Sequence, residues 1–379
     1  MIARSVWQPS IYQRVRLCAN LLCFDLAEFG TYDLFQWIDI EAAPEPVDAY
    51  EQHLREVELA EKVGFKYHFI IEHQNSYVGQ CTSPPVYLSA LAQRTKTIRF
   101  GTMIFLLPFY NPVRLAQDTA MLDQLSRGRL ELGAGIGVLE HEFTRWNLPF
   151  QERREMAEEA LAIIRKAWTE ESVTYEGKYW KFEEAFARPK PYQKPHPPIW
   201  FACHSKRSFE YAAAQNFNVS QNLDMDTVIA EKFTLWKRLW KEAGHKGPMP
   251  RTFLTREVHV AETDEQAIEE AAPYIVQAYA LGIERLQQTR VGAKGTEDTP
   301  TNREILRVFE GMTTGIKFWL DNGLAHIGSP GTVAKQLEKA HELIGFDVYC
   351  GRHRFGEMPS HLVEKSIRLF GEKVLPALS

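Results

Sequence analysis

Short apolar runs of strand length alternate with amphipathic stretches of helix length along most of the chain. Eight runs are candidate strands: Leu17–Phe24, Tyr67–Ile71, Ile98–Leu106, Arg129–Ala134, Ile199–Ala202, Asn218–Gln221, Thr255–Ala261 and Phe346–Cys350. Amphipathic helices are predicted at 44–64, 113–125, 153–169 and 332–344. This alternation is typical of βα units around a parallel sheet. Eight strands favour a single α/β (β/α)8 TIM barrel, although the pattern alone does not exclude an open doubly wound sheet.

Two segments depart from the βα repeat. The stretch Ser172–Phe182 alternates around Glu-Gly-Lys and predicts a β-hairpin excursion, which a proline-rich return follows. The polar stretch Gly292–Glu304 predicts an insertion between strands 7 and 8. Loops after the strands line the active site of a barrel, so this insertion is interpreted either as a lid that excludes water or as an ordinary surface loop.

Charge and cysteine content narrow the class of protein. The 379 residues include 44 Lys and Arg against 49 Asp and Glu, a formal net charge of -5, so neither nucleic acid nor an anionic membrane is an expected partner. Five cysteines without a CxxC pair favour a reducing compartment over a disulfide framework. No run approaches the about 18 apolar residues of a membrane span. We expect a cytoplasmic protein, with an N-terminal extension at 1–16 and one barrel domain at 17–379.

A glycine-rich strand end invites a dinucleotide-binding interpretation, which its spacing opposes. Gly133, Gly135 and Gly137 alternate, but the third position of GxGxxG falls on Val138. Glycines without a Cβ do allow a flat ring or a phosphate to approach the backbone closely. A tight βα turn explains the same residues, and both interpretations remain open.

Glu72 and His73 follow the second predicted strand directly. Barrel catalytic groups lie at such strand ends, and a histidine there can donate, accept or shuttle a proton near neutral pH. An isolated Glu-His pair is equally compatible with a structural role. Metal binding is not indicated, because the sequence around His141 is not HExxH and Cys203-His204 has no spaced companion pair.

The fifth predicted strand runs into a cluster of polar residues that open a helix. They are His204, Ser205, Lys206, Arg207 and Ser208. Hydroxyls, cations and free amides at a helix N-terminus form an anion site, for which a phosphate is the natural occupant. The alternative is that Ser208 is a plain N-cap and the two cations are only solvated.

Four segments together resemble the bacterial luciferase-like, flavin-dependent monooxygenase superfamily. They are EHQ at 72–74, the stretch 98–137 with its NPVR and LDQLSRGR motifs, PPIWFACHSKRSFEYAA at 197–213 and HIGSPGTVAKQLEK at 326–339. The resemblance runs in order from about Leu17 to the C-terminus. It implies a barrel that binds FMN as reduced flavin, supplied by a separate NAD(P)H:flavin reductase. Dioxygen would then give a C4a-(hydro)peroxyflavin that oxidises a small organic substrate.

The resemblance also assigns expected roles to single residues. It places His73 beside the flavin, while Gln74 replaces the second histidine of the luciferase EHH motif. A non-prolyl cis bond beneath the flavin maps to Met103 and Ile104, and phosphate contacts map to His204, Ser205 and Ser208. The phosphate-binding arginine of the luciferase α-subunit is replaced by Ile136, so Lys206 and Arg207 are candidates for that charge. A homodimer through the helices near 84–93 and 113–125 is expected as well.

Aromatic residues at the predicted strand ends indicate the kind of substrate. Phe24, Phe29, Tyr110 and Trp146 are expected to line the barrel mouth, which predicts an apolar or aromatic organic substrate. Aromatics at strand ends also serve as core. Two further functions remain: a deazaflavin-dependent oxidoreductase of the same fold, and a flavin-binding protein without turnover. The retained His73 and the complete set of βα units favour an enzyme.

Overall fold

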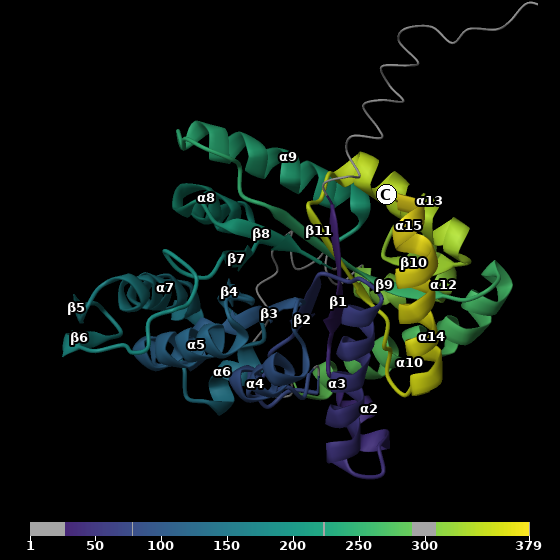
Figure 1. Ribbon diagram of the computed structural model, residues 1–379, viewed down its shortest axis with the longest axis horizontal. Helices are drawn as coiled ribbons and strands as arrows, with labels where there is room; N and C mark the ends of the chain where they lie inside the picture. The colour runs from purple at the N-terminus through teal and green to yellow at the C-terminus, as the bar shows by residue number, and fades with distance from the viewer. Residues whose placement is uncertain (1–26, 78, 223, 290–307, 379) are drawn as a thin grey trace, which may run out of the picture.

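The computed structural model describes residues 27–77, 79–222, 224–289 and 308–378. Within these residues, eight parallel strands close into a barrel that helices surround (Figure 1), as the alternating pattern predicts. The barrel strands are β1 (Glu28–Asp33), β2 (Tyr67–Ile70), β3 (Arg99–Leu106), β4 (Leu130–Gly135), β7 (Ile199–Ala202), β8 (Asn218–Gln221), β9 (Thr252–Val260) and β11 (Val348–Arg352). A further parallel strand, β10 (Ala325–Gly328), pairs with the second half of β9.

Strand β1 closes the barrel between β2 and β11. Glu28 pairs with Val348 on one side, and Gly30 pairs with Tyr67 on the other. The prediction of Leu17–Phe24 as the first barrel strand was therefore wrong, and that segment lies outside the described residues, as does the extension at 1–16. The sequence of β1, EFGTYD, mixes polar residues and a glycine with two aromatic residues, so it does not stand out as an apolar run. Gly30 is required there, because a Cβ at this position would lie 2.5 Å from the Tyr67 carbonyl oxygen.

The helices follow the strands in the order expected for βα units. The α-helices are α2 (Trp37–Ala42), α3 (Pro46–Lys62), α4 (Pro84–Arg94), α5 (Pro112–Ser126), α6 (Glu140–Arg145), α7 (Arg153–Thr169), α8 (Lys206–Gln215), α9 (Asp226–Glu242), α10 (Asp264–Thr289), α12 (Ile316–Asp321), α13 (Pro330–Ile344), α14 (Ser360–Leu369) and α15 (Leu375–Leu378). Three short turns of other helix types are η1 (Leu107–Phe109), η2 (Phe150–Glu152) and η3 (Phe370–Val374). The four helices predicted from the sequence correspond to α3, α5, α7 and α13.

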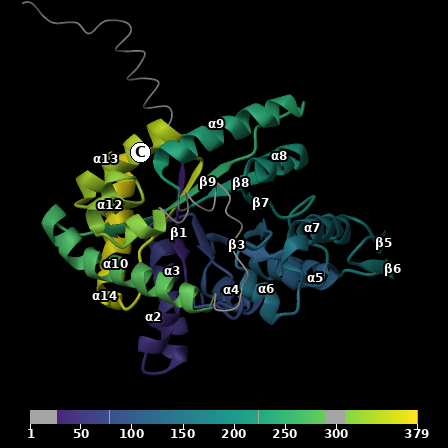
Figure 2. The same cartoon turned by 180° about the vertical axis from the view of Figure 1, so that it is seen from behind.

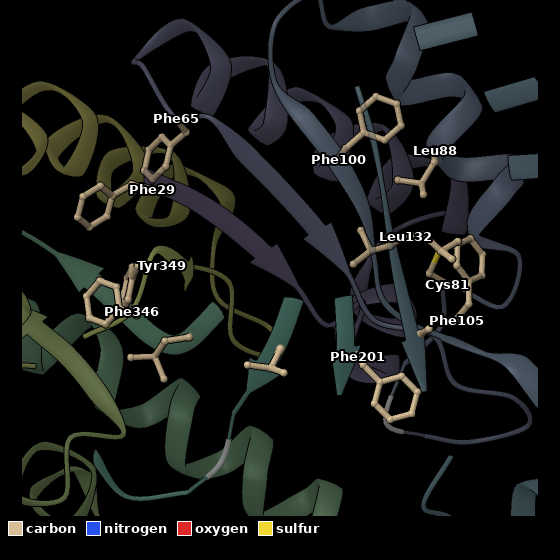
Figure 3. Close-up of a cluster of buried hydrophobic side chains, with 14 of the residues drawn as sticks. Phe29, Phe65, Cys81, Leu88, Phe100, Phe105, Leu132, Phe201, Phe346 and Tyr349 are labelled. Carbon is tan, nitrogen blue, oxygen red and sulfur yellow. The ribbon is translucent and has the colours of Figure 1, made fainter. Parts of the chain in front are cut away.

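Hydrophobic side chains pack in two separate regions. One cluster lies between strands and helices (Figure 3), and a smaller one fills the barrel interior. The interior cluster consists of Tyr32, Tyr67, Phe69, Met103, Trp200, Phe253, Val348 and Cys350. Leu34, Ile71 and Ile104 are only partly buried and pack against this interior cluster. Because they come at the carboxyl ends of β1, β2 and β3, they mark the end of the barrel that can receive a ligand.

The predicted hairpin is confirmed as β5 (Val173–Glu176) and β6 (Lys181–Ala185), which pair antiparallel. It lies beside α7 at the edge of the molecule in both views (Figures 1 and 2). Glu159 of α7 fixes the hairpin turn, because its carboxylate accepts hydrogen bonds from the backbone N–H groups of Lys178, Tyr179 and Trp180. The insertion at Gly292–Glu304 lies outside the described residues, between α10 and α12. No helix among the described residues is long and apolar enough to cross a membrane.

Candidate active site

His73 lies at the carboxyl end of β2 and is held by a buried glutamate from α6. Its Nδ1 is 2.9 Å from Oε1 of Glu142, and the same oxygen accepts the backbone N–H of Gln74 at 2.8 Å. A carboxylate oxygen can only accept, so Nδ1 carries the proton and the neutral ring keeps Nε2 as its acceptor. The ring orientation is therefore fixed through Nδ1, as proton transfer at a defined atom requires.

Glu72 points away from His73 into a separate hydrogen-bond network. Its Oε1 accepts hydrogen bonds from Gln74 Nε2 at 2.8 Å and from the Tyr110 hydroxyl at 2.6 Å. Its Oε2 accepts the backbone N–H of Leu106 at 2.9 Å. Burial raises the pKa of Glu72 to about 7, although these three donors act in the opposite direction. Glu72 thus joins the ends of β2 and β3 and sets the positions of the loops around His73.

We predict that Glu72 makes stability fall as the pH rises from about 5 to about 8. Its pKa is about 7 in the folded protein and 4.5 ordinarily, so folding takes up a proton in this interval. The stabilisation is complete below the ordinary value and lost as the pH rises through 7, about 3 kcal/mol in all. Thermal melting of Glu72→Gln should lack this component, whereas the exposed control Glu176→Gln should follow the wild type. Parallel melting curves for all three proteins would contradict the prediction.

A non-prolyl cis peptide bond joins Met103 and Ile104, as expected from the sequence. It falls where the pairing of β3 with β4 shifts register. The Tyr32 hydroxyl donates to the Met103 carbonyl oxygen at 2.7 Å and holds this part of β3 from inside the barrel. Together with Leu34 and Ile71, Ile104 forms an apolar floor at the carboxyl end of the barrel.

The three alternate glycines are explained by close packing within the protein. A Cβ at Gly133 would lie 2.0 Å from the Thr102 carbonyl oxygen, and one at Gly135 would lie 1.8 Å from Cδ1 of Ile104. Gly137 has a φ of +78°, which favours glycine, and a Cβ there would meet the Phe143 ring. These residues let β3 and β4 approach each other beneath the apolar floor. Their contact with a cofactor stays a prediction.

The predicted anion site at the start of α8 is built around two serines and an arginine from α7. Ser205 caps the helix, and its Oγ is 3.1 Å from Oγ of Ser208. Arg154 Nη2 donates to Ser208 Oγ at 3.1 Å. Arg154 Nη1 is buried, has no hydrogen-bond partner among the described residues, and lies 3.5 Å from the Glu158 carboxylate. A cation, two hydroxyls and a helix N-terminus therefore converge, although Nη1 of this cation is already ion-paired with Glu158.

The other residues predicted for this site lie at its edge or outside it. Lys206 and Arg207 are 69% and 63% exposed and approach Glu210 and Glu155, because the helical period turns them to the outer face of α8. His204 lies beside the site, with Nδ1 4.0 Å from the Asp224 carboxylate. The charge comes from Arg154 instead, which the sequence reasoning missed. Its signal was the Arg-Arg pair that opens α7, but no spacing rule connects that helix start with α8.

Residues 28–346 match the family model for luciferase-like monooxygenases. The chain belongs to this family. It is 28% identical over 334 residues to limonene 1,2-monooxygenase of Rhodococcus erythropolis, covering 86% of this chain and 81% of that protein. It is 28% identical over 226 residues to the oxygenase component of the flavin-dependent trigonelline monooxygenase of Acinetobacter baylyi, covering 58% and 61%. The structure resembles monooxygenase RslO1 of Streptomyces bottropensis with a TM-score of 0.77 and 26% identity, covering 93% of this chain and all of that one.

The barrel places Phe29 away from its mouth, contrary to the prediction. The ring lies 6.0 Å from those of Tyr349 and Phe370, in the cluster between strands and helices (Figure 3). Side chains alternate along a strand, and Phe29 falls on the outward face near the amino end of β1. It therefore belongs to the core and lines no ligand site.

Two other predicted aromatic residues lie closer to His73. Tyr110 donates to Glu72, which directly precedes His73. Trp146 follows α6, the helix that supplies Glu142, and its half-exposed ring packs 5.9 Å from that of Phe109. Phe24 lies outside the described residues. Contact of Tyr110 and Trp146 with substrate stays a prediction for this family member.

Proposed function

We propose that this member of the luciferase-like monooxygenase family is an oxygenase component that uses reduced FMN and dioxygen to oxidise a small organic substrate. The observation that carries the proposal is the anion site of Ser205, Ser208 and Arg154 at the carboxyl end of β7. It lies at the same end of the barrel as His73. FMN ends in a phosphate, which would accept hydrogen bonds from the two serine hydroxyls, the amides that open α8 and the Arg154 guanidinium. The residues present therefore fit FMN.

Each part of the site has a distinct proposed task. Ser205, Ser208 and Arg154 would hold the phosphate, and the apolar floor around Ile104 would take the flat ring. Bound reduced FMN supplies the two electrons with which dioxygen is activated. His73 would hold or move a proton at Nε2, and Glu142 would keep that nitrogen in place. The floor would also keep water from the reacting centre.

The proposal includes a separate NAD(P)H:flavin reductase as partner. The glycine-rich strand end lacks the GxGxxG spacing of a nicotinamide site, so the chain offers no sequence signal for making its own reduced flavin. The similar trigonelline enzyme is named as an oxygenase component. For the substrate, the aromatic residues Tyr110 and Trp146 near His73 support an apolar or aromatic body.

The test compares three cofactors and then follows oxygen. The protein is titrated anaerobically with FMN, reduced FMN and 8-hydroxy-5-deazaflavin, and reduced FMN should bind most tightly. Mixing with 18O2 and a panel of apolar organic compounds should then put labelled oxygen into one of them and lower hydrogen peroxide release. Tighter deazaflavin binding with hydride transfer in the absence of oxygen would establish the deazaflavin alternative. If flavin binds but no compound of the panel is oxidised, and the rate at which reduced FMN is reoxidised is the same as without the protein, the chain is a flavin-binding protein.

We also propose a homodimer formed by α4 and α5. Their outer faces expose the apolar residues Val86, Met121 and Leu125, whereas Leu88 and Leu122 are buried toward the barrel. Light scattering should give about twice the chain mass, since exposed apolar residues clustered on neighbouring helices favour association. The double variant Met121→Glu and Leu125→Glu should be monomeric, and Leu343→Glu, at an exposed leucine of α13, should not. A wild-type mass near 43.6 kDa would refute the dimer.

A further inference from the structure

A second polar cluster lies inside the barrel, on strands that contribute to neither His73 nor the anion site. Glu257 of β9 and Arg352 of β11 are register partners and form an ion pair of 2.7 Å. Their side chains are only 1% and 4% exposed. The hydroxyl of Tyr279, from α10, donates to the same carboxylate. No step of the proposed flavin reaction uses these groups.

The cluster faces the barrel interior. Phe253 of β9 and Cys350 of β11 belong to the interior hydrophobic cluster. Side chains alternate along a strand, so Thr255 and Glu257 share the face of Phe253, and Arg352 shares that of Cys350. The Tyr32 ring, also from the interior cluster, lies 5.9 Å from the Arg352 guanidinium carbon.

Three buried polar atoms of this wall have no hydrogen-bond partner among the described residues. They are Nε of Arg352, Oγ1 of Thr255 and Oδ1 of Asn222, which follows the neighbouring strand β8. Thr255 lies one inward-facing position before Glu257, about 7 Å along the strand. A buried unpartnered polar group costs about 1–3 kcal/mol. A polar group that bound here would satisfy two donors and one acceptor that the fold leaves open.

The net charge of the cluster determines which kind of polar ligand group it can bind. The carboxylate of Glu257 balances Arg352, and burial raises the pKa of Tyr32 and of Tyr279, which both remain neutral. An added carboxylate or phosphate would place an uncompensated negative charge beside Glu257. A carbonyl or hydroxyl oxygen would accept from Arg352 Nε and Thr255 without that cost.

We infer that the wall formed by Thr255, Glu257, Arg352 and Asn222 is a substrate subsite for a neutral oxygen-bearing group, such as a ketone or alcohol. This deepens the proposed function and rests on it, because the barrel mouth must bind an organic substrate. The aromatic residues near His73, Tyr110 and the half-exposed Trp146, would take the rest of the molecule. The substrate class is thus a neutral compound with an apolar body and one polar end.

A matched series of three probes tests the subsite. Calorimetry with the anaerobic reduced-FMN complex compares 4-phenylcyclohexanone, phenylcyclohexane and 4-phenylcyclohexanecarboxylate, and the ketone should bind about tenfold more tightly than either. Thr255→Val should abolish this preference without lowering the melting temperature, because the hydroxyl it removes has no hydrogen-bond partner within the described part of the chain. The control Thr102→Val removes another buried hydroxyl that lacks a partner there, one on the outward face of β3 opposite Leu132, and should keep the preference. If Thr255→Val does not fold, Thr255→Ala, which removes the same hydroxyl, replaces it.

The outcomes separate the subsite from the proposed function. Equal binding of all three probes, tightest binding of the carboxylate, or the same preference in wild type and Thr255→Val would overturn the subsite. If FMN binds and supports oxygenation while the ketone preference is missing, only the subsite fails. If the ketone preference appears in the free protein while reduced FMN does not bind, the proposed function fails and the subsite stands.

Discussion

Replacement of His73 by alanine is expected to lower turnover by about 10^2- to 10^4-fold, the usual contribution of a general acid or base. The affinity for FMN should change little, because the anion site and the apolar floor do not include this ring. Stopped-flow oxidation of bound reduced FMN with substrate, together with product analysis, measures the loss. FMN titration of the same variant shows that the cofactor site is intact.

Glu142 gives this prediction a second test, because it orients His73 through Nδ1 at 2.9 Å. Glu142→Gln keeps an acceptor oxygen but loses the negative charge, so it should lower kcat less than His73→Ala and shift the pH profile of kcat. His361→Ala, at an exposed histidine of α14, is the matched control and should leave turnover unchanged. A loss of less than about threefold for His73→Ala would remove the catalytic assignment.

The barrel could be predicted from the sequence because its strands are buried on both faces. Seven of the eight predicted strands lie within or next to observed barrel strands, since runs such as Ile199–Ala202 are apolar without interruption. Strand β1 does not show this pattern. Its polar residues Thr31 and Asp33 are satisfied by histidines of neighbouring elements, His68 and His53, and such partners are not visible in a local window.

Residues of the candidate site could be predicted only where a feature of the neighbouring sequence marks them. His73 and the serines at the start of α8 stand at strand and helix ends, which spacing reveals. Glu142 has no local sequence signal that marks it, because its partner His73 lies 69 residues away in the chain. Phe29 was wrongly placed at the mouth, since the face of a strand cannot be assigned until its pairing partner is known.

Arg154 is the other residue whose replacement should have a large effect, in this case on cofactor affinity. Arg154→Met keeps an unbranched side chain but removes the charge. A hydrogen bond to a charged group contributes about 1.5–3 kcal/mol, so this variant should bind FMN about 10- to 100-fold more weakly. Riboflavin has no phosphate, so its affinity should stay nearly constant. Fluorescence titration of both ligands with both proteins measures the difference.

The neighbouring cations decide whether the effect belongs to Arg154 or to positive charge in general. Lys206→Met and Arg207→Met each remove one cation close to the same helix start, yet both side chains are mainly exposed and approach Glu210 and Glu155. Solvent screens exposed charges, so each of these variants should change FMN affinity by less than about threefold. Equal losses in all three variants would show that the site acts only through its overall potential. A parallel loss of riboflavin affinity in Arg154→Met would place the phosphate elsewhere and leave Arg154 as a support for α8 through Ser208.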